Sequence, residues 1–413
     1  MSIAVETARV ALLGCGTVGR AFATLSRTAP AATQALHITA ALVRDTSRPR
    51  PLDLPPLTDE ARLILQSEPD VLVELLGGTE PARSLVLEAL QKRIPVVTAN
   101  KTLLAHHGAE LREAAHRTNT PLLYEAAVIA GVPFLGTFNR RPQAANVRSL
   151  LGILNGTSNF ILTRCATANV TIAEALADAQ RRGYAEPDPR DDVQGIDARD
   201  KLALLLQHFA HVSVPLDTIE TRGLDAIGGR QAAHARELGG SIKPVVSADW
   251  TEGAVDAFVG PAFVPHTHPL ATVNGVENAI VLRSSAGRLI FQGPGAGPEI
   301  TAATVLDDVH EALAGSGHVL SRVESGAVNT PATGWLVTLD AARLPGATDV
   351  ADLLASHGLF ASRTTPTHSD DGREVRSLVL WPARRVVVER ALAALCSASG
   401  CAASLLRALE VEP

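Results

Sequence analysis

Aromatic residues, cysteine, methionine and long apolar runs are all scarce in this sequence. Phe, Trp and Tyr make up 3% of the 413 residues, so Ala, Leu and Val must build most of the core. No run approaches the roughly 20 apolar residues that cross a bilayer. The first ten residues, MSIAVETARV, lack the basic and apolar segments of a signal peptide. We therefore expect a cytoplasmic protein with no membrane partner.

Cysteine spacing and net charge exclude two further classes of protein. The four cysteines are scattered, with the spacing of neither metal ligands nor a disulfide framework. The formal net charge of −6 argues against a nucleic-acid partner, which would need a basic face. With 46% hydrophobic and 19% charged residues, the chain is instead typical of a globular protein of two or three domains.

In the first third of the chain, short apolar segments alternate with amphipathic ones. Strands are predicted over residues 9–13, 37–43, 70–75, 94–99 and 122–127. Helices are predicted from residue 19 and over residues 81–92 and 107–117. Alternation at this spacing indicates an α/β fold with a parallel sheet that helices cover on both faces.

The rest of the chain follows a different pattern. Strands at residues 148–154, 242–248 and 279–284, with helices at 172–182 and 197–211, indicate an α+β region that ends near residue 328. From Thr330 the predicted order is strand, helix, two strands, helix and strand, over residues 335–339, 349–357, 359–365, 374–380, 386–398 and 403–410. This order predicts a ferredoxin-like module.

A glycine-rich turn follows the first strand and opens the first helix. It reads Gly14-Cys15-Gly16-Thr17-Val18-Gly19, a G-x-G-x-x-G pattern. In a βαβ unit such glycines form a tight turn, let the backbone approach a pyrophosphate and let helix and strand pack closely. Unpaired N–H groups at the helix N-terminus favour the phosphates. We predict a nicotinamide dinucleotide site here, the alternative being a purely structural turn.

The ends of two other strands bear on the cofactor. Arg44 and Asp45 follow the second strand. An acid there suits the ribose 2′-hydroxyl of NAD(H), and an arginine suits the 2′-phosphate of NADP(H). We favour NADP(H) through Arg44, the alternative being a solvated loop arginine. Lys101 follows the fourth strand, at the edge where ligands bind, although position alone favours an ordinary lysine in the first turn of a helix.

The segment over residues 179–201 is rich in acids and ends in a lysine. Its charged residues include Glu186, Asp188, Asp191, Asp192, Asp197, Asp200 and Lys201. Prolines 187 and 189 predict a loop in the middle, and a helix that begins near residue 195 would place Asp197 and Lys201 on one face. The segment is either a solvated loop with one helical ion pair, or a site where carboxylates bind an ammonium while the lysine exchanges an alcohol proton.

The same segment carries a family resemblance. Residues 179, 183–185, 188, 189, 192, 193, 195, 197 and 201 match in order the signature of the homoserine dehydrogenases. Further matching motifs are GCGTVG at 14–19, GGT at 77–79, TANK at 98–101, EAAV at 125–128, NGTSN at 155–159 and GPGAG at 293–297. Over about residues 8–328 the chain thus resembles enzymes that interconvert L-homoserine and L-aspartate 4-semialdehyde by NAD(P)-dependent hydride transfer.

The resemblance implies roles for particular residues. It implies that Lys201 is the proton donor and acceptor and that Lys101 assists at the substrate oxygen and the cofactor. It implies substrate contacts from Gly183, Glu186, Asp192 and Asp197, with Asp197 also counted among the catalytic residues. The cofactor would contact Gly14, Gly16, Thr17, Val18, Gly19, Arg44, Gly78, Thr79, Lys101 and Gly297. The main-chain oxygens of Glu125, Val128, Ala130 and Val132 would bind Na⁺ or K⁺.

The resemblance also implies an architecture. A Rossmann-type domain over residues 1–135, rejoined by about 300–328, would precede a catalytic and dimerisation domain over 136–299 and an ACT-like regulatory domain over 330–413. The expected protein is a homodimer of the monofunctional form, because no kinase-sized segment precedes residue 1, and L-threonine is a candidate effector.

Two alternatives stay open beside this interpretation. One is a non-catalytic NADP(H)-binding regulatory protein, which would lack the combination of acids and lysines. The other is a different NAD(P)-dependent oxidoreductase of amino-acid semialdehydes. An acyl-phosphate chemistry would need an activated cysteine, and Cys165 has no such setting in the sequence.

Overall fold

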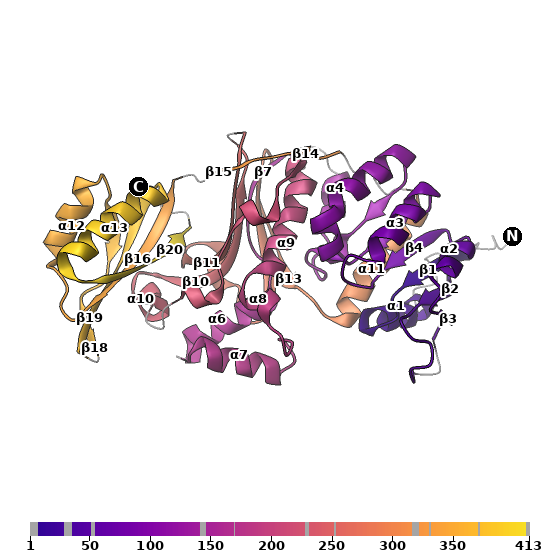
Figure 1. Cartoon of the computed structure of the whole chain (residues 1–413), viewed down its shortest axis with the longest axis horizontal. Helices are drawn as coiled ribbons and strands as arrows, with labels where there is room; N and C mark the ends of the chain where they lie inside the picture. The colour runs from indigo at the N-terminus through magenta and orange to yellow at the C-terminus, as the bar shows by residue number, and fades with distance from the viewer. Residues whose placement is uncertain are drawn as a thin grey trace. The chain divides into compact units, whose positions relative to one another are not determined.

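Figure 1 shows the computed structural model, which describes residues 7–28, 35–50, 54–140, 146–168, 170–227, 231–251, 253–315, 322–329, 332–370 and 372–409. The chain divides into two compact units. The first comprises Met1–Arg148, Asp200–Leu216 and Arg283–Gly326, and the second comprises Ser149–Arg199, Asp217–Leu282 and Ala327–Pro413. These units do not coincide with the three predicted domains, whose boundaries remain predictions.

The first unit contains a six-stranded parallel sheet. Its strands are β1 (Ala8–Leu13), β2 (Leu36–Leu42), β3 (Leu57–Thr58), β4 (Val71–Glu74), β5 (Val96–Thr98) and β6 (Leu122–Leu123). They are arranged in the order β3-β2-β1-β4-β5-β6, which is the doubly wound order of dinucleotide-binding folds. The predicted parallel sheet is therefore confirmed, with β3 as an additional edge strand.

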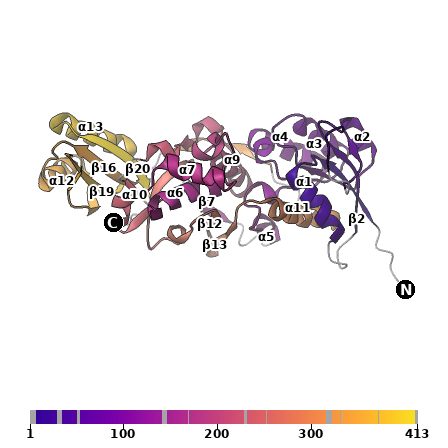
Figure 2. The same ribbon diagram turned by 90° about the horizontal axis from the view of Figure 1, so that it is seen from below.

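Helices cover both faces of this sheet. They are α1 (Thr17–Thr28), α2 (Ala61–Gln66), α3 (Ala82–Gln91), α4 (Lys101–Thr118) and α11 (Pro298–Leu313). Consecutive residues of β1, from Val10 to Leu13, are all fully buried, as in a central strand covered on both sides. On α11 the buried residues Ala302, Val305 and Val309 join the same core as Leu12 and Phe22, and α11 lies beside α1 (Figure 2).

The strand predicted over residues 122–127 is only partly correct. Pairing ends at Leu123, and Glu125–Ala127 forms a 3-10 turn. The Glu125 N–H donates to the Asp308 carboxylate, and the Glu125 carboxylate accepts three backbone N–H groups from residues 134–136. These long-range partners hold the backbone out of the sheet. A local apolar run does not reveal them.

The first unit also contains elements outside this sheet and its covering helices. They include α5 (Leu135–Arg140), β8 (Val212–Ser213), β13 (Gly287–Pro294) and β14 (Glu324–Ser325). The helix predicted over residues 197–211 is divided: α9 spans Ile196–Leu205 and continues as a π-helix over Leu206–Ala210. This widened turn ends at His211, which has a positive φ of 55° and terminates the helix.

The second unit is built on a mixed sheet. The strands that precede residue 330 are β7 (Val147–Ile153), β9 (Glu220–Thr221), β10 (Gly240–Asp249), β11 (Val255–Pro265), β12 (Glu277–Ser284) and β15 (Val328–Asn329). The helices are α6 (Gly156–Ala168), α7 (Ile172–Arg181), α8 (Arg190–Val193) and α10 (Gln231–Glu237). The acidic loop predicted around residues 186–192 therefore contains one helical turn, α8, which starts directly after Pro189.

The C-terminal part of this unit has the predicted ferredoxin-like order, with one short additional strand at His368–Asp370. Its elements are β16 (Thr333–Ala341), α12 (Ala347–Ser356), β17 (Ala361–Thr364), β18 (His368–Asp370), β19 (Arg373–Ala383), α13 (Arg385–Ser399) and β20 (Ala402–Ala408). The four main strands follow the order β20-β16-β19-β17. Residue 410, at the end of the last predicted strand, lies outside the described residues.

The sheet of this module is buried on both faces. Along β16, Trp335 and Val337 face the core formed with α12 and α13, whereas Leu336 joins a core with α6, α7 and α10. In addition, β20 pairs in parallel with β11 at Ala262↔Arg407. The module therefore shares both a sheet and a core with the rest of the same unit.

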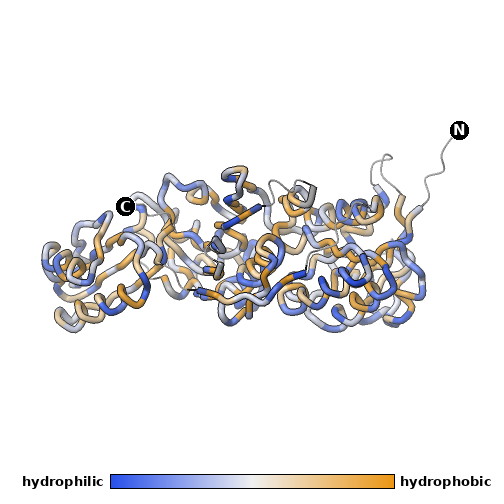
Figure 3. Tube along the Cα trace, turned by 90° about the horizontal axis from the view of Figure 1, so that it is seen from above, coloured by the Kyte–Doolittle hydropathy of each residue, from blue (hydrophilic) through white to orange (hydrophobic). Residues whose placement is uncertain are grey.

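Along the helices, hydrophobic residues are interrupted by hydrophilic ones every few positions (Figure 3). Within the described part of the chain, none of the helices has the length and apolar character that a bilayer crossing requires.

Candidate active site

A cavity of about 370 Å³ opens at the point where the strand order of the first sheet reverses, beyond β1 and β4. It is lined by the turn after β1, the start of α1, the segment after β2, and Leu75 and Leu76 after β4. In doubly wound sheets this crevice is where a dinucleotide binds. Gly14, Gly16 and Thr17 of the predicted turn all line it.

The three glycines of the turn are needed for different reasons. Gly14 has φ of +97°, and a Cβ there would lie 2.7 Å from the Leu75 carbonyl oxygen. A Cβ on Gly19 would lie 2.2 Å from the Gly14 carbonyl oxygen, so Gly19 allows α1 to pack on the turn. A Cβ on Gly16 would meet nothing within 4 Å. The open space at Gly16 fits the approach of a ligand phosphate to the backbone.

Four arginines line the same cavity: Arg20, Arg44, Arg48 and Arg50. The neighbouring acid, Asp45, is engaged locally, because its carboxylate accepts the Ser47 N–H at 2.8 Å and the Ser47 hydroxyl at 2.6 Å. These hydrogen bonds lower the pKa of Asp45 below its ordinary value. The cavity is thus basic on the side where β2 ends, which suits phosphate groups.

A buried acid that sequence reasoning missed fixes the loops beside the glycine turn. Glu74 ends β4 and is fully buried; its carboxylate accepts the Thr98 hydroxyl at 2.6 Å and the Leu76 N–H at 2.8 Å. Burial raises the pKa of Glu74. Asn100 donates to Glu74 at 3.3 Å and to the Gly78 carbonyl at 2.7 Å, while it caps α4. This network sets the position of Lys101, the first residue of α4.

The turn at residues 130–131, which contains a predicted cation ligand, lies against the loop at residues 294–297, which contains a predicted cofactor contact. Ala130 N–H donates to the Gly295 carbonyl at 3.3 Å and Gly131 N–H to the Pro294 carbonyl at 3.1 Å. Gly297, with φ of +137°, precedes α11 as its N-cap. The Thr79 carbonyl accepts the Arg83 N–H at the start of α3, after the two positive-φ residues Gly77 and Gly78. The GPGAG motif therefore closes against the turn that contains the predicted cation residues.

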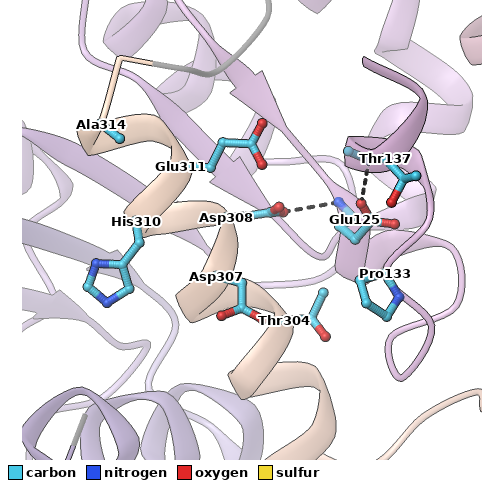
Figure 4. A pocket seen from close by; sticks show the side chains of 10 residues that line it. Glu125, Pro133, Thr137, Thr304, Asp307, Asp308, His310, Glu311 and Ala314 are labelled. Atoms are coloured by element: carbon cyan, nitrogen blue, oxygen red, sulfur yellow. Dashed lines mark hydrogen bonds between the residues drawn. The ribbon is translucent and has the colours of Figure 1, made fainter. Parts of the chain in front are cut away.

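An acidic cavity of about 450 Å³ adjoins this turn (Figure 4). Glu125, Asp307, Asp308 and Glu311 line it, and Asp308 points toward the Glu125 backbone. Burial raises the pKa values of Glu125 and Asp308, each helped by a neighbouring carboxylate. Val128, Ala130 and Val132 are buried, and the Ala130 carbonyl accepts the Thr304 hydroxyl. Across the described residues, no group of three or more His, Cys, Asp and Glu side chains forms a metal site.

In the second unit, the start of α6 holds the acidic segment. Asn155 Nδ2 donates to Asp192 Oδ1 at 2.7 Å and to Asp197 Oδ2 at 2.9 Å. The Ser158 hydroxyl donates to the Asp192 carbonyl at 2.8 Å, and the Thr157 hydroxyl donates to the Tyr184 carbonyl at 2.7 Å. Asn155 also caps α6, because its Oδ1 accepts the Ser158 N–H at 2.7 Å. The sequence analysis assigned no role to Asn155. The signal that could have indicated one is its position as a polar residue between a strand and a helix.

The structure separates the acids of the segment into two groups. Asp192 and Asp197 are brought together by Asn155, and Asp197 is buried. Asp188 instead forms an exposed ion pair with Arg190 at 2.6 Å, and Glu186 is exposed. Gly183, predicted at the substrate, lies just after α7 with φ of +75°, and a Cβ there would meet nothing within 4 Å.

The helix that follows carries Asp197 and Lys201 one turn apart. Both lie on α9, and both are largely buried, with 7% and 9% of their surfaces exposed. Side chains four residues apart on a helix project from the same face. The prediction that Asp197 and Lys201 lie on one face of a helix is therefore confirmed.

The chain is similar to known homoserine dehydrogenases. Residues 14–125 match the family model for the NAD binding domain of homoserine dehydrogenase, and residues 133–310 match the homoserine dehydrogenase model. A homoserine dehydrogenase from Synechocystis is 37% identical over 315 residues, covering 73% of this chain and 72% of its own. One from Corynebacterium glutamicum is 40% identical over 313 residues, covering 73% and 70%.

A solved structure extends the likeness to the C-terminal module. The homoserine dehydrogenase from Thiobacillus denitrificans superposes with a TM-score of 0.87 at 29% identity and covers 98% of this chain and 99% of its own. The family models and the curated relatives cover most of the chain, and this solved structure covers nearly all of it. The chain belongs to the homoserine dehydrogenase family, the NAD(P)-dependent oxidoreductases that act in the biosynthesis of the aspartate-derived amino acids.

Proposed function

We propose that this enzyme interconverts L-homoserine and L-aspartate 4-semialdehyde with Lys201 as the group that exchanges the alcohol proton. The supporting observation is the placement of the buried Lys201 one turn after Asp197, whose carboxylate Asn155 holds together with Asp192. Two adjacent carboxylates suit the ammonium group of an amino-acid substrate. A lysine on the same helix face is then near the other end of a four-carbon molecule.

In the oxidation of homoserine, the hydroxyl proton moves to the Lys201 amine as the C–H bond of the alcohol carbon breaks. When bound, NAD(P)⁺ accepts the hydride from that carbon. Asp192, Asp197 and Glu186 hold the substrate ammonium, and Gly183 leaves room beside the substrate. Lys101, whose backbone the Asn100 and Glu74 network orients, hydrogen-bonds the substrate oxygen. In the reverse direction Lys201 returns the proton to the aldehyde oxygen.

Absorbance at 340 nm with L-homoserine and NADP⁺ tests this assignment. We expect Lys201→Ala to lower kcat by at least about 100-fold, the usual contribution of a positioned acid or base, while the Tm stays close to the wild-type value. Lys92→Ala is a matched control, since Lys92 forms an exposed helical ion pair with Glu88 on α3. Full turnover by Lys201→Ala would refute the proposed role.

We further propose that NADP(H) is preferred over NAD(H). Arg44, Arg48 and Arg50 line the cavity beyond β2, and the Asp45 carboxylate is occupied by Ser47. Arginines there suit a 2′-phosphate, whereas an acid turned inward would suit the 2′-hydroxyl. The ratio of kcat/KM for NADP⁺ to that for NAD⁺ is the test: we expect it to exceed one and to fall at least tenfold in Arg44→Ala. A wild-type preference for NAD⁺ would contradict the proposal.

A monovalent cation, Na⁺ or K⁺, is proposed at the turn of residues 125–132, through the carbonyls of Glu125, Val128, Ala130 and Val132. Its support is the burial of this turn beside the acidic cavity of Figure 4, where carboxyl groups favour a cation. The Thr304 hydroxyl uses one lone pair of the Ala130 carbonyl and leaves a second. Replacing Na⁺ and K⁺ by choline is expected to lower the Tm, and an unchanged Tm would refute the site.

For the C-terminal module we propose an ACT-like regulatory role with L-threonine as effector, in a homodimer. The loop after β16 is held in place, because the Leu344 N–H donates to Glu374 at 2.7 Å and Arg376 donates to the Pro345 carbonyl at 3.1 Å. Gly346 then precedes α12. Rates at saturating L-threonine test the effector, and light scattering of the eluting protein tests the dimer. An unchanged rate would remove threonine and leave the enzyme assignment intact.

A further inference from the structure

A third cavity lies in the second unit, among α6, α7, α10 and the first residues of β10. Its volume is about 230 Å³. Most of its wall is aliphatic, from Leu162, Ala166, Val170, Ile172, Ile227, Ala232 and Ile242. None of the acids of the active site lines it. It is small for a ligand pocket, so a molecule of only a few carbon atoms would fill it.

Two polar side chains of this cavity have no partner within the described part of the chain. Arg236, an exposed residue on α10, lines the cavity, and its guanidinium forms neither an ion pair nor a hydrogen bond there. The Ser241 hydroxyl oxygen at the start of β10 is buried, again without a hydrogen-bond partner among the described residues. Buried hydroxyl groups nearly always have a partner. Both groups are hydrogen-bond donors that a ligand oxygen would satisfy.

The N-terminus of α7 forms another polar part of the wall. Thr171 and Ile172 are the N-cap and first residue of α7, so the positive end of that helix faces the cavity. The Thr171 N–H and hydroxyl both donate to the Glu174 carboxylate at 2.8 Å within a capping box, so Glu174 already offsets part of this positive end. Of the described residues that line the cavity, none carries a carboxylate. Two hydrogen-bond donors, the cationic Arg236 and the Ser241 hydroxyl, therefore lie beside an aliphatic wall.

We propose that this cavity binds a small branched aliphatic carboxylate. The carboxylate would accept hydrogen bonds from Arg236 and Ser241, and the branched alkyl group would lie against Leu162, Ala166 and Ile242. The alternative is a packing void, which would bind neutral and anionic molecules of the same shape equally well. Charge is therefore the property that separates the two.

Cys165 supplies a probe that does not depend on enzyme activity. It lines the cavity, is half-buried, and burial raises the pKa of its thiol. The rate of its alkylation by N-ethylmaleimide is followed by peptide mass spectrometry on the full chain, with excess NADP⁺ and no L-homoserine, so that no turnover takes place. Isovalerate is the ligand probe, and isovaleramide is the uncharged molecule of the same shape. The alkylation of Cys396 on α13 is the internal control.

We expect isovalerate to slow the alkylation of Cys165 at least fivefold in a saturable manner and to leave Cys396 unchanged. Isovaleramide should protect weakly, and Arg236→Gln should raise the half-protecting concentration of isovalerate at least tenfold. Saturation-transfer NMR of the isovalerate methyl groups provides a second readout. The saturation-transfer signal of isovalerate should disappear in Ala166→Leu, whose larger side chain fills the cavity, and in Arg236→Gln. Equal effects of acid and amide, or an isovalerate response unchanged in Arg236→Gln, would overturn the proposal.

Discussion

The role of Asn155 leads to a prediction that separates positioning from folding. Its side chain makes three hydrogen bonds: Nδ2 donates to Asp192 and Asp197, and Oδ1 accepts the Ser158 N–H at the start of α6. Asn155→Ser retains a hydroxyl that can cap the helix but cannot reach both carboxylates. Asn155→Ala removes the cap and the two donors together. Comparing the variants isolates what the amide contributes to the substrate acids.

The magnitude follows from the number and type of bonds. A hydrogen bond to an ionised group contributes about 1.5–3 kcal/mol. Asp192 and Asp197 retain other interactions, so we take about 2–3 kcal/mol for both bonds together, or about 30- to 150-fold in kcat/KM for L-homoserine. Loss of the N-cap costs about 1 kcal/mol of folding free energy. We therefore expect Asn155→Ala to lower the free energy of unfolding by about 1 kcal/mol. The free energy of unfolding of Asn155→Ser should stay near that of the wild type.

Steady-state kinetics at 340 nm and urea unfolding provide the two measurements. For both variants the KM for L-homoserine should rise while the KM for the cofactor stays within about twofold. Only Asn155→Ala should unfold at lower urea. The reasoning fails if Asn155→Ser keeps its KM for L-homoserine within threefold of wild type, or if the two KM values rise together, since the amide would then act on the fold as a whole.

Three further predictions concern other parts of the molecule. Gly16→Ala should retain the wild-type Tm yet weaken cofactor binding at least tenfold, because a Cβ there meets no protein atom; Gly19→Ala should lower the Tm, because its Cβ would lie 2.2 Å from the Gly14 carbonyl oxygen. Equal effects in calorimetry and cofactor titration would contradict this distinction. Glu74→Leu should lower the free energy of unfolding by about 2 kcal/mol or more, because Thr98 and Asn100 lose a buried acceptor. Urea unfolding curves that coincide for Glu74→Leu and the wild type would rule this prediction out. Lys243 is buried, which lowers its pKa from 10.5 to about 8. The folded state therefore opposes protonation, at a cost of about 3 kcal/mol below pH 8 that disappears as pH rises toward 10.5. The stability of the wild type relative to Lys243→Met should accordingly increase between pH 8 and 10.5, and parallel pH profiles would show the inference to be wrong.

Local patterns predicted the parts of this fold in which neighbours in sequence are also neighbours in space. Alternation of apolar strands and amphipathic helices identified the parallel sheet, and the glycine pattern identified the turn between β1 and α1. Asp197 and Lys201 were placed on one face because four residues make about one helical turn. The ferredoxin-like order of the C-terminal module followed from element types alone.

Contacts between distant segments are what only the tertiary structure decided. Glu125 leaves the predicted strand because Asp308, far along the chain, binds its N–H group. In the sequence Glu74 is a single acid within an apolar strand. In the folded chain Thr98 and Asn100 both donate hydrogen bonds to its carboxylate. Likewise, only the folded chain shows that Asn155 selects Asp192 and Asp197 and leaves Asp188 to Arg190 in solvent. A sequence pattern records which side chains are apolar or charged, whereas the partner of a buried polar group depends on which segments packing brings within hydrogen-bond distance.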